Sequence, residues 1–149
     1  MKIYLASSWR NEIQQKYVKL LREAGHQVYD FKHPTDTEEL GFHWEDVDAD
    51  FRSWTVKDYQ KGLSHPVAER GFQRDWDAML WADVCVLLLP CGRSAHAEAG
   101  WMKGAGKPVY VVMEELEVAE LMYKLFDGVC DGPEELLEML VRYMGTGPV

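Results

Sequence analysis

Residues 83–113 read DVCVLLLPCGRSAHAEAGWMKGAGKPVYVVM, and this stretch changes from a strand pattern to a helix pattern and back. Its first seven residues are almost continuously apolar, which is typical of a strand that is buried on both faces of a parallel sheet. A loop at 90–94 leads into a helix predicted over 95–105, and the apolar run 108–113 predicts the next strand. Together these elements indicate one βαβ unit.

The same alternation continues on both sides of this unit. It predicts an α/β fold: a doubly wound, flavodoxin-like or Rossmann-like parallel sheet of five strands with helices on both faces. If the strand order is 2-1-3-4-5, the loops that follow the first and third strands are neighbours. The other predicted strands span 3–6, 27–31 and 125–130, and the other predicted helices span 11–24, 66–82, 118–123 and the residues from Pro133 onward.

A chain of 149 residues fits one domain, so we expect a single domain over 1–149. Residues 32–64 form a segment that is too long for a simple connection and is rich in aromatic and acidic side chains. We therefore expect a partly helical insertion in this part of the domain.

Composition and motifs exclude several classes of function. A net charge of −9 argues against a nucleic-acid polymer as partner, and the apolar runs are too short to span a membrane. Three cysteines give no disulfide framework and no signal peptide is visible, so the cytoplasm is the expected location. Neither a dinucleotide fingerprint nor a P-loop is present, and the five histidines lack metal-ligand spacing. No metal and no cofactor are expected.

Two loops are placed to bind a ligand. In open α/β sheets, ligands bind beyond the carboxyl ends of the strands, where the strand order reverses. The loops at 7–10 and 90–96 follow the first and third predicted strands, and both lead into helix N-termini, which attract anions.

Two carboxylates are candidates for catalysis. Glu98 is expected in about the first turn of its helix, where the dipole favours the ionised form that a nucleophile needs. Asp75 borders the apolar face of another helix, and partial burial would raise its pKa and suit it to acid–base work. The alternatives are an acidic residue that only stabilises its helix and a solvated surface charge. Two carboxylates about 5 Å apart are the arrangement of retaining glycoside chemistry.

Other side chains are candidates for binding. Ser8, Arg10, Arg93 and Ser94 could hold a phosphate or sugar hydroxyls, although helix capping and surface exposure explain them equally well. Trp44 could stack on a base, or it could only pack within the 32–64 segment.

Three segments resemble a known family. They are IYLASSWRN at 3–11, the stretch 74–84, and GRSAHAEAG at 92–100 followed by GKPV at 106–109. In these segments the chain resembles the nucleoside 2-deoxyribosyltransferases and the related deoxynucleoside 5′-monophosphate N-glycosidases.

The resemblance implies roles for particular residues. Glu98 takes the position of the nucleophile and Asp75 that of the aspartate acting on the base, while Tyr4, Ser8 and Arg10 fall in the substrate loop. It also implies a homo-oligomer, a dimer or larger, in which a neighbouring subunit completes the shared active site. The segment 121–123, with Tyr123, is the candidate for that contribution.

One departure from the family concerns the sugar. The transferases carry an aspartate six residues before the nucleophile, where this chain has Gly92 followed by Arg93 and Ser94. Exchanging an acid for a cation favours a 5′-phosphate.

The expected function is therefore cleavage or transfer at the N-glycosidic bond of a 2′-deoxynucleoside or its 5′-monophosphate, through a covalent glycosyl-Glu98 intermediate. The alternatives are a non-catalytic nucleotide-binding or sensor domain and an N-glycosidase of a larger nucleotide such as NAD. The base, the sugar and the acceptor stay open.

Overall fold

The computed structural model describes residues 1–34 and 40–146, and it divides into two compact units. The first unit combines Met1–Asp30 with Trp81–Val149, and the second unit is Phe31–Leu80. The expectation of a single domain over 1–149 stays a prediction.

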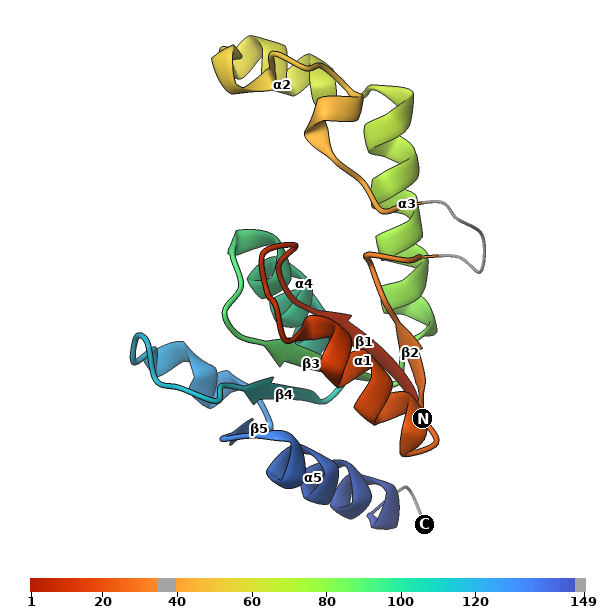
Figure 1. Cartoon of the computed structure of the whole chain (residues 1–149), viewed down its shortest axis with the longest axis vertical. Coiled ribbons are helices and arrows are strands. Elements are labelled where there is room, and N and C mark those ends of the chain that lie inside the picture. The colour runs from red at the N-terminus through yellow and green to blue at the C-terminus, as the bar shows by residue number, and fades with distance from the viewer. Residues whose placement is uncertain (35–39, 147–149) are drawn as a thin grey trace. The chain divides into compact units, whose positions relative to one another are not determined.

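The first unit contains a five-stranded, all-parallel sheet in the order β2-β1-β3-β4-β5 (Figure 1). This order confirms the predicted doubly wound fold, and it places the carboxyl ends of the first and third strands side by side. Register pairs Ile3 with both Val28 and Val84. The strands are β1 (Lys2–Ala6), β2 (Gln27–Tyr29), β3 (Val84–Leu88), β4 (Val109–Val112) and β5 (Gly128–Cys130).

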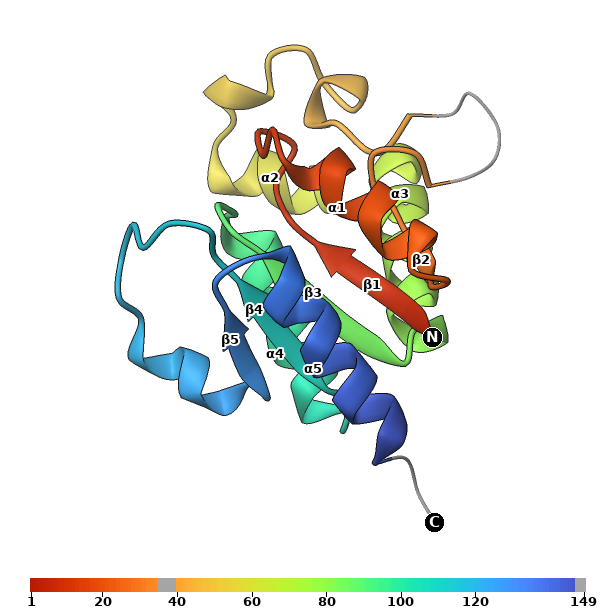
Figure 2. The same ribbon diagram turned by 60° about the horizontal axis from the view of Figure 1, so that its bottom comes forward.

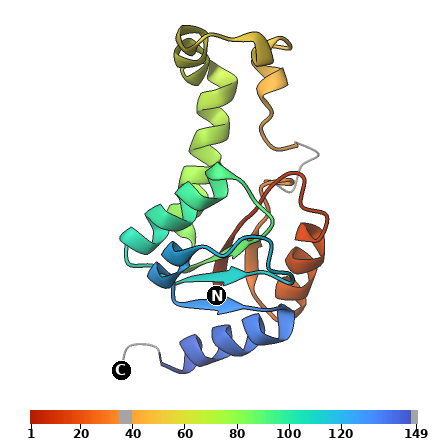
Figure 3. The same ribbon diagram turned by 90° about the vertical axis from the view of Figure 1, so that its left-hand side faces the viewer.

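Helices cover both faces of this sheet (Figures 2 and 3). The helices α1 (Gln14–Glu23) and α5 (Pro133–Gly145) lie on one face, and α4 (Arg93–Gly104) lies on the other. Successive side chains of a strand point to opposite faces, so each fully buried strand contributes to two cores. The core beneath α1 and α5 includes Ile3, Leu5, Tyr17, Leu21, Val84, Val86, Leu88, Val112, Leu136 and Leu140.

Several boundaries differ from the predicted ones, and local hydrogen bonds give the reason. The first helix begins at Gln14 because Asn11 Oδ1 accepts a hydrogen bond of 3.0 Å from the Ile13 amide, which holds residues 11–13 in a turn. The helix after β3 begins at Arg93 because Gly92 is its N-cap residue. The short helix predicted at 118–123 is a 3-10 helix, η3 (Leu121–Leu125).

The second unit is built from η1 (Trp44–Asp46), η2 (Phe51–Ser53), α2 (Val56–Leu63) and most of α3 (Pro66–Trp81). A reciprocal capping box starts α2, since Thr55 and Asp58 each accept a hydrogen bond from the backbone amide of the other. Two large apolar side chains of α3 are on its surface, since Phe72 and Leu80 are 64% and 53% exposed. The Phe72 ring stacks on Trp76, one turn further along α3. This ring pair covers Phe72 only in part.

No helix in the described part of the chain has the length and apolar character that crossing a membrane requires.

Candidate functional site

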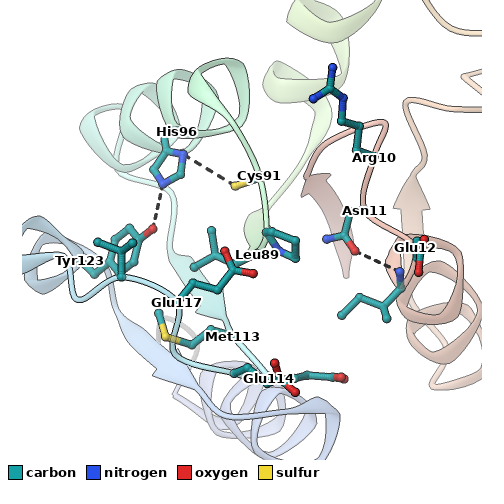
Figure 4. Close-up of a pocket in the computed structure, with 14 residues that line it drawn as sticks. Arg10, Asn11, Glu12, Leu89, Cys91, His96, Met113, Glu114, Glu117 and Tyr123 are labelled. Carbon is teal, nitrogen blue, oxygen red and sulfur yellow. Dashed lines mark hydrogen bonds between the residues drawn. The ribbon is translucent and has the colours of Figure 1, made fainter.

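A cavity of about 620 Å³ lies in the first unit, beyond the carboxyl ends of β1, β3 and β4 (Figure 4). The cavity therefore lies at the strand-order reversal where an α/β sheet binds ligands. Its walls come from the loop after β1 (Arg10, Asn11, Glu12, Ile13), the loop after β3 with α4 (Leu89, Pro90, Cys91, His96), and the segment after β4 (Met113, Glu114, Glu115, Glu117, Val118, Tyr123).

Asn11 fixes the wall on the β1 side. Its side chain is 2% exposed, and its amide donates hydrogen bonds to Ser7 Oγ at 2.9 Å and to the Leu88 carbonyl at 3.4 Å. Ser7 Oγ also donates to the Leu88 carbonyl at 2.9 Å. These bonds tie the loop after β1 to the end of β3. Asn11 was not among the predicted site residues, although an amide side chain just before a helix is a common turn signal.

His96 connects the start of α4 to η3 at the opposite wall. Its Nδ1 lies 2.7 Å from the Gly92 carbonyl oxygen, and its Nε2 lies 2.9 Å from the Tyr123 hydroxyl. The two rings are stacked, with centroids 5.8 Å apart. Tyr123 thus contacts His96 of its own chain. The sequence prediction included Tyr123 but missed His96.

The cavity wall is acidic. Four glutamates line it, Glu12, Glu114, Glu115 and Glu117, against one arginine, Arg10. Figure 4 shows the Glu117 side chain between the Leu89 side and the Tyr123 side of the cavity. Such a wall favours neutral or cationic groups over anions.

Glu98 is in the second turn of α4 and not in the first, because the helix begins at Arg93. The helix dipole therefore supports its ionised form less than expected, since that effect decays within the first turn. Glu98 is half-buried and does not line the cavity, but its charge acts on Cys91, which does.

Cys91, which lines the cavity, is a second potential nucleophile. Burial, and after it the charge of Glu98, raises the pKa of the Cys91 thiol to about 12. Only the thiolate is a good nucleophile, so the raised pKa disfavours Cys91 as a nucleophile near neutral pH. The same two causes raise the pKa of Cys85 on β3.

The remaining residues predicted in the first unit are spread around its sheet edge. Tyr4 is buried in β1 and stacks on Tyr29 with ring centroids 5.3 Å apart. Ser8 Oγ accepts a hydrogen bond of 3.2 Å from the Arg10 amide. Arg93 and Ser94 begin α4 and are exposed, and neither lines the cavity. Arg10 is therefore the predicted cation that reaches it.

Two predicted residues belong to the second unit. Asp75 is half-buried in the middle of α3. Trp44 packs edge-to-face within an aromatic cluster formed with Phe42, Trp54 and Tyr59. The roles of both residues stay predictions. Within residues 1–34 and 40–146, no three His, Cys, Asp or Glu side chains group so that they could hold a metal ion.

No protein-family model matches the sequence, and a search of curated proteins gives no match. Solved structures do match. A 2-deoxyribosyltransferase from the psychrotolerant bacterium Bacillus psychrosaccharolyticus superposes with a TM-score of 0.64 and 24% identity, over 89% of this chain and 87% of that one. The CMP N-glycosidase of Clostridium botulinum superposes with a TM-score of 0.52 and 17% identity, over 95% of this chain and 99% of that one. The resemblance noted in the sequence is thus confirmed for the fold.

Proposed function

We propose that this chain acts on the N-glycosidic bond of a 2′-deoxynucleoside or its 5′-monophosphate, with Glu98 as nucleophile. One observation carries the proposal: Glu98 is on α4, the helix that follows Cys91 and carries His96, and both of these residues line the cavity at the strand-order reversal. The carboxylate therefore lies next to the place where this fold binds ligands. The competing Cys91 thiol is held protonated there.

The proposed chemistry has two steps. Glu98 attacks C1′, the bond between C1′ and the base nitrogen breaks, and the electron pair leaves with the base while Asp75 donates a proton to it. Water or a second base then attacks C1′, and the Glu98 carboxylate is released. Water gives a hydrolase, and a base gives a transferase.

The names of the structural neighbours support this reaction class, since one is a 2-deoxyribosyltransferase and the other a CMP N-glycosidase. The proposal includes an assembly of identical subunits. Leu121, Met122 and Leu125 on η3 are 74%, 55% and 56% exposed, and exposed apolar groups of this kind favour association. Sedimentation of the purified protein tests the assembly.

The test of the reaction is base release, measured by chromatography. The protein is incubated with a panel of nucleosides, 5′-monophosphates and NAD, with and without a second free base. We expect release that falls by at least about 10³-fold in Glu98→Gln, because the amide cannot act as the nucleophile. The control is Glu23→Gln, a change at an exposed carboxylate paired with Lys19, which should keep full activity.

The intermediate is tested separately by mass spectrometry of acid-quenched enzyme. A nucleoside with a 2′-fluoro sugar slows the breakdown of the intermediate, so a sugar adduct on the Glu98 peptide is expected. Full activity of Glu98→Gln would refute the nucleophile. Tight nucleotide binding without release would favour a non-catalytic binding domain.

A further inference from the structure

The hydrogen bonds of His96 determine which of its nitrogens carries the proton. The Gly92 carbonyl oxygen can only accept, so at 2.7 Å the neutral imidazole must donate from Nδ1. Cys91 Sγ is 3.7 Å from the same nitrogen and is a much weaker partner. Nε2 is therefore an acceptor.

This tautomer fixes the role of Tyr123. With Nε2 as acceptor at 2.9 Å, the Tyr123 hydroxyl donates its proton to His96. Burial, and after it the charges of Cys91 and Glu120, raises the pKa of Tyr123, so the phenol stays protonated at neutral pH. Toward a ligand in the cavity, the Tyr123 oxygen then acts as a hydrogen-bond acceptor.

The surroundings of this oxygen favour a ligand group that donates and carries no negative charge. The acidic wall adds Glu114, Glu115 and Glu117 on the same segment as Tyr123. Gly92 leaves room at the start of α4, since a Cβ at that position would meet no described atom within 4 Å. A phosphate monoester would bring about two negative charges to a wall that already carries several.

We propose that the Tyr123 oxygen, held by His96, accepts a hydrogen bond from the free 5′-hydroxyl of the substrate sugar, so that the substrate is a nucleoside and not its 5′-phosphate ester. This inference rests on the proposed function and names the substrate class of that site. Tyr123 is the specificity-determining residue, and His96 is a positioning residue that acts through it.

The test compares kcat/KM for base release from a 2′-deoxynucleoside, its analogues without the 3′- or the 5′-hydroxyl, and its 5′-monophosphate. In the unmodified protein we expect a loss of about tenfold for the analogue without the 5′-hydroxyl, and of at least about tenfold for the monophosphate. In Tyr123→Phe, the values of kcat/KM for the nucleoside and for that analogue should differ by less than about twofold. The matched control is Tyr143→Phe on α5, which should keep the discrimination.

A second variant covers the case in which Tyr123→Phe fails to fold. The shorter amide in His96→Asn can still donate to the Gly92 carbonyl, but it lacks the acceptor at the Nε2 position. We expect it to lose the same discrimination, a result that loss of packing alone would not give.

The outcomes separate the two proposals. Release without discrimination, discrimination that survives in Tyr123→Phe, or a preference for the monophosphate would each overturn this inference alone. No base release from any of the four compounds would overturn the proposed function, and this inference with it.

Discussion

The hydroxyl of Tyr17 donates a hydrogen bond of 2.8 Å to Oε1 of Glu114, and so connects α1 to the segment that follows β4. Tyr17 is fully buried, and burial followed by the Glu114 carboxylate raises its pKa above the ordinary value. Lys16 contacts the same carboxylate oxygen at 3.4 Å. Since Glu114 lines the cavity, this bond orients part of its acidic wall.

Replacement of Tyr17 by phenylalanine removes the hydrogen bond and keeps the ring in the core. We expect Tyr17→Phe to lower the free energy of unfolding by about 1 kcal/mol, the usual net value of one such bond. Urea titration measures the change. Tyr143→Phe, in a ring packed against the same core, should change it less. Equal stability of Tyr17→Phe and the unmodified protein would show that the bond contributes nothing.

Asn11 gives a prediction that depends on pH. In Asn11→Asp, a carboxylate oxygen replaces the amide donor that now faces Ser7 Oγ and the Leu88 carbonyl. We expect a loss of about 1–3 kcal/mol at neutral pH, because the Leu88 carbonyl loses one of its two side-chain donors and meets a charge.

This loss should shrink in acid. The folded site favours the protonated carboxyl, which can donate, so the pKa of the introduced group is raised in the folded state. The loss of stability in Asn11→Asp is then full at a pH well above the folded-state pKa. It decreases as the pH falls through that pKa, which lies above the ordinary value of about 3.9. Urea titrations near neutral pH and in mild acid test this, and a loss that does not change with pH would contradict it.

The sheet was predictable because burial on both faces leaves continuous apolar runs. The run at 83–89 became β3 (Val84–Leu88), and the rule for open sheets gave the position of the cavity. Helix starts were less predictable, because Asn11 and Gly92 act through turn and cap geometry. The contact between His96 and Tyr123 could not be predicted, since 27 residues separate them and the contact depends on where η3 lies.

Close packing at Gly62 gives a prediction for the second unit. A Cβ added at Gly62 on α2 would lie 2.5 Å from Cη2 of Trp54, whose indole also donates to Asp48 at 2.8 Å. We expect Gly62→Ala to displace this ring, to destabilise the protein by about 1–3 kcal/mol and to change its tryptophan fluorescence. Gly104→Ala on α4, where a Cβ would meet nothing, should be neutral or stabilising by up to about 1 kcal/mol. Similar stability of both variants would contradict the packing argument.

His26 makes stability depend on pH near neutrality. Burial, and after it the charge of the N-terminal ammonium 3.3 Å from Nδ1, lowers the pKa of His26 below its ordinary value. The unfolded chain therefore binds a proton at His26 more readily than the folded chain does. Its contribution to stability is full above about pH 6.5 and decreases as the pH falls through that value toward the folded pKa.

The variant His26→Gln isolates this effect. Between about pH 7.5 and 5.5, a range that brackets the unfolded pKa, the unmodified protein should lose more stability in urea titrations than the variant does. Parallel pH profiles of the two proteins would contradict the assignment.

The last prediction concerns the charge of Glu98 and does not depend on activity. Burial and the Glu98 carboxylate, in that order, raise the pKa of Cys91 to about 12. In Glu98→Gln the charge is lost and the burial remains, so the pKa should fall and still exceed its ordinary value. More thiolate at a given pH means faster alkylation of Cys91 by iodoacetamide. The rate is followed by mass spectrometry of the Cys91 peptide, which separates it from the buried Cys85 and Cys130. Glu23→Gln should leave the rate unchanged, whereas an unchanged rate in Glu98→Gln would mean that its carboxylate lies too far from the cavity wall to act there.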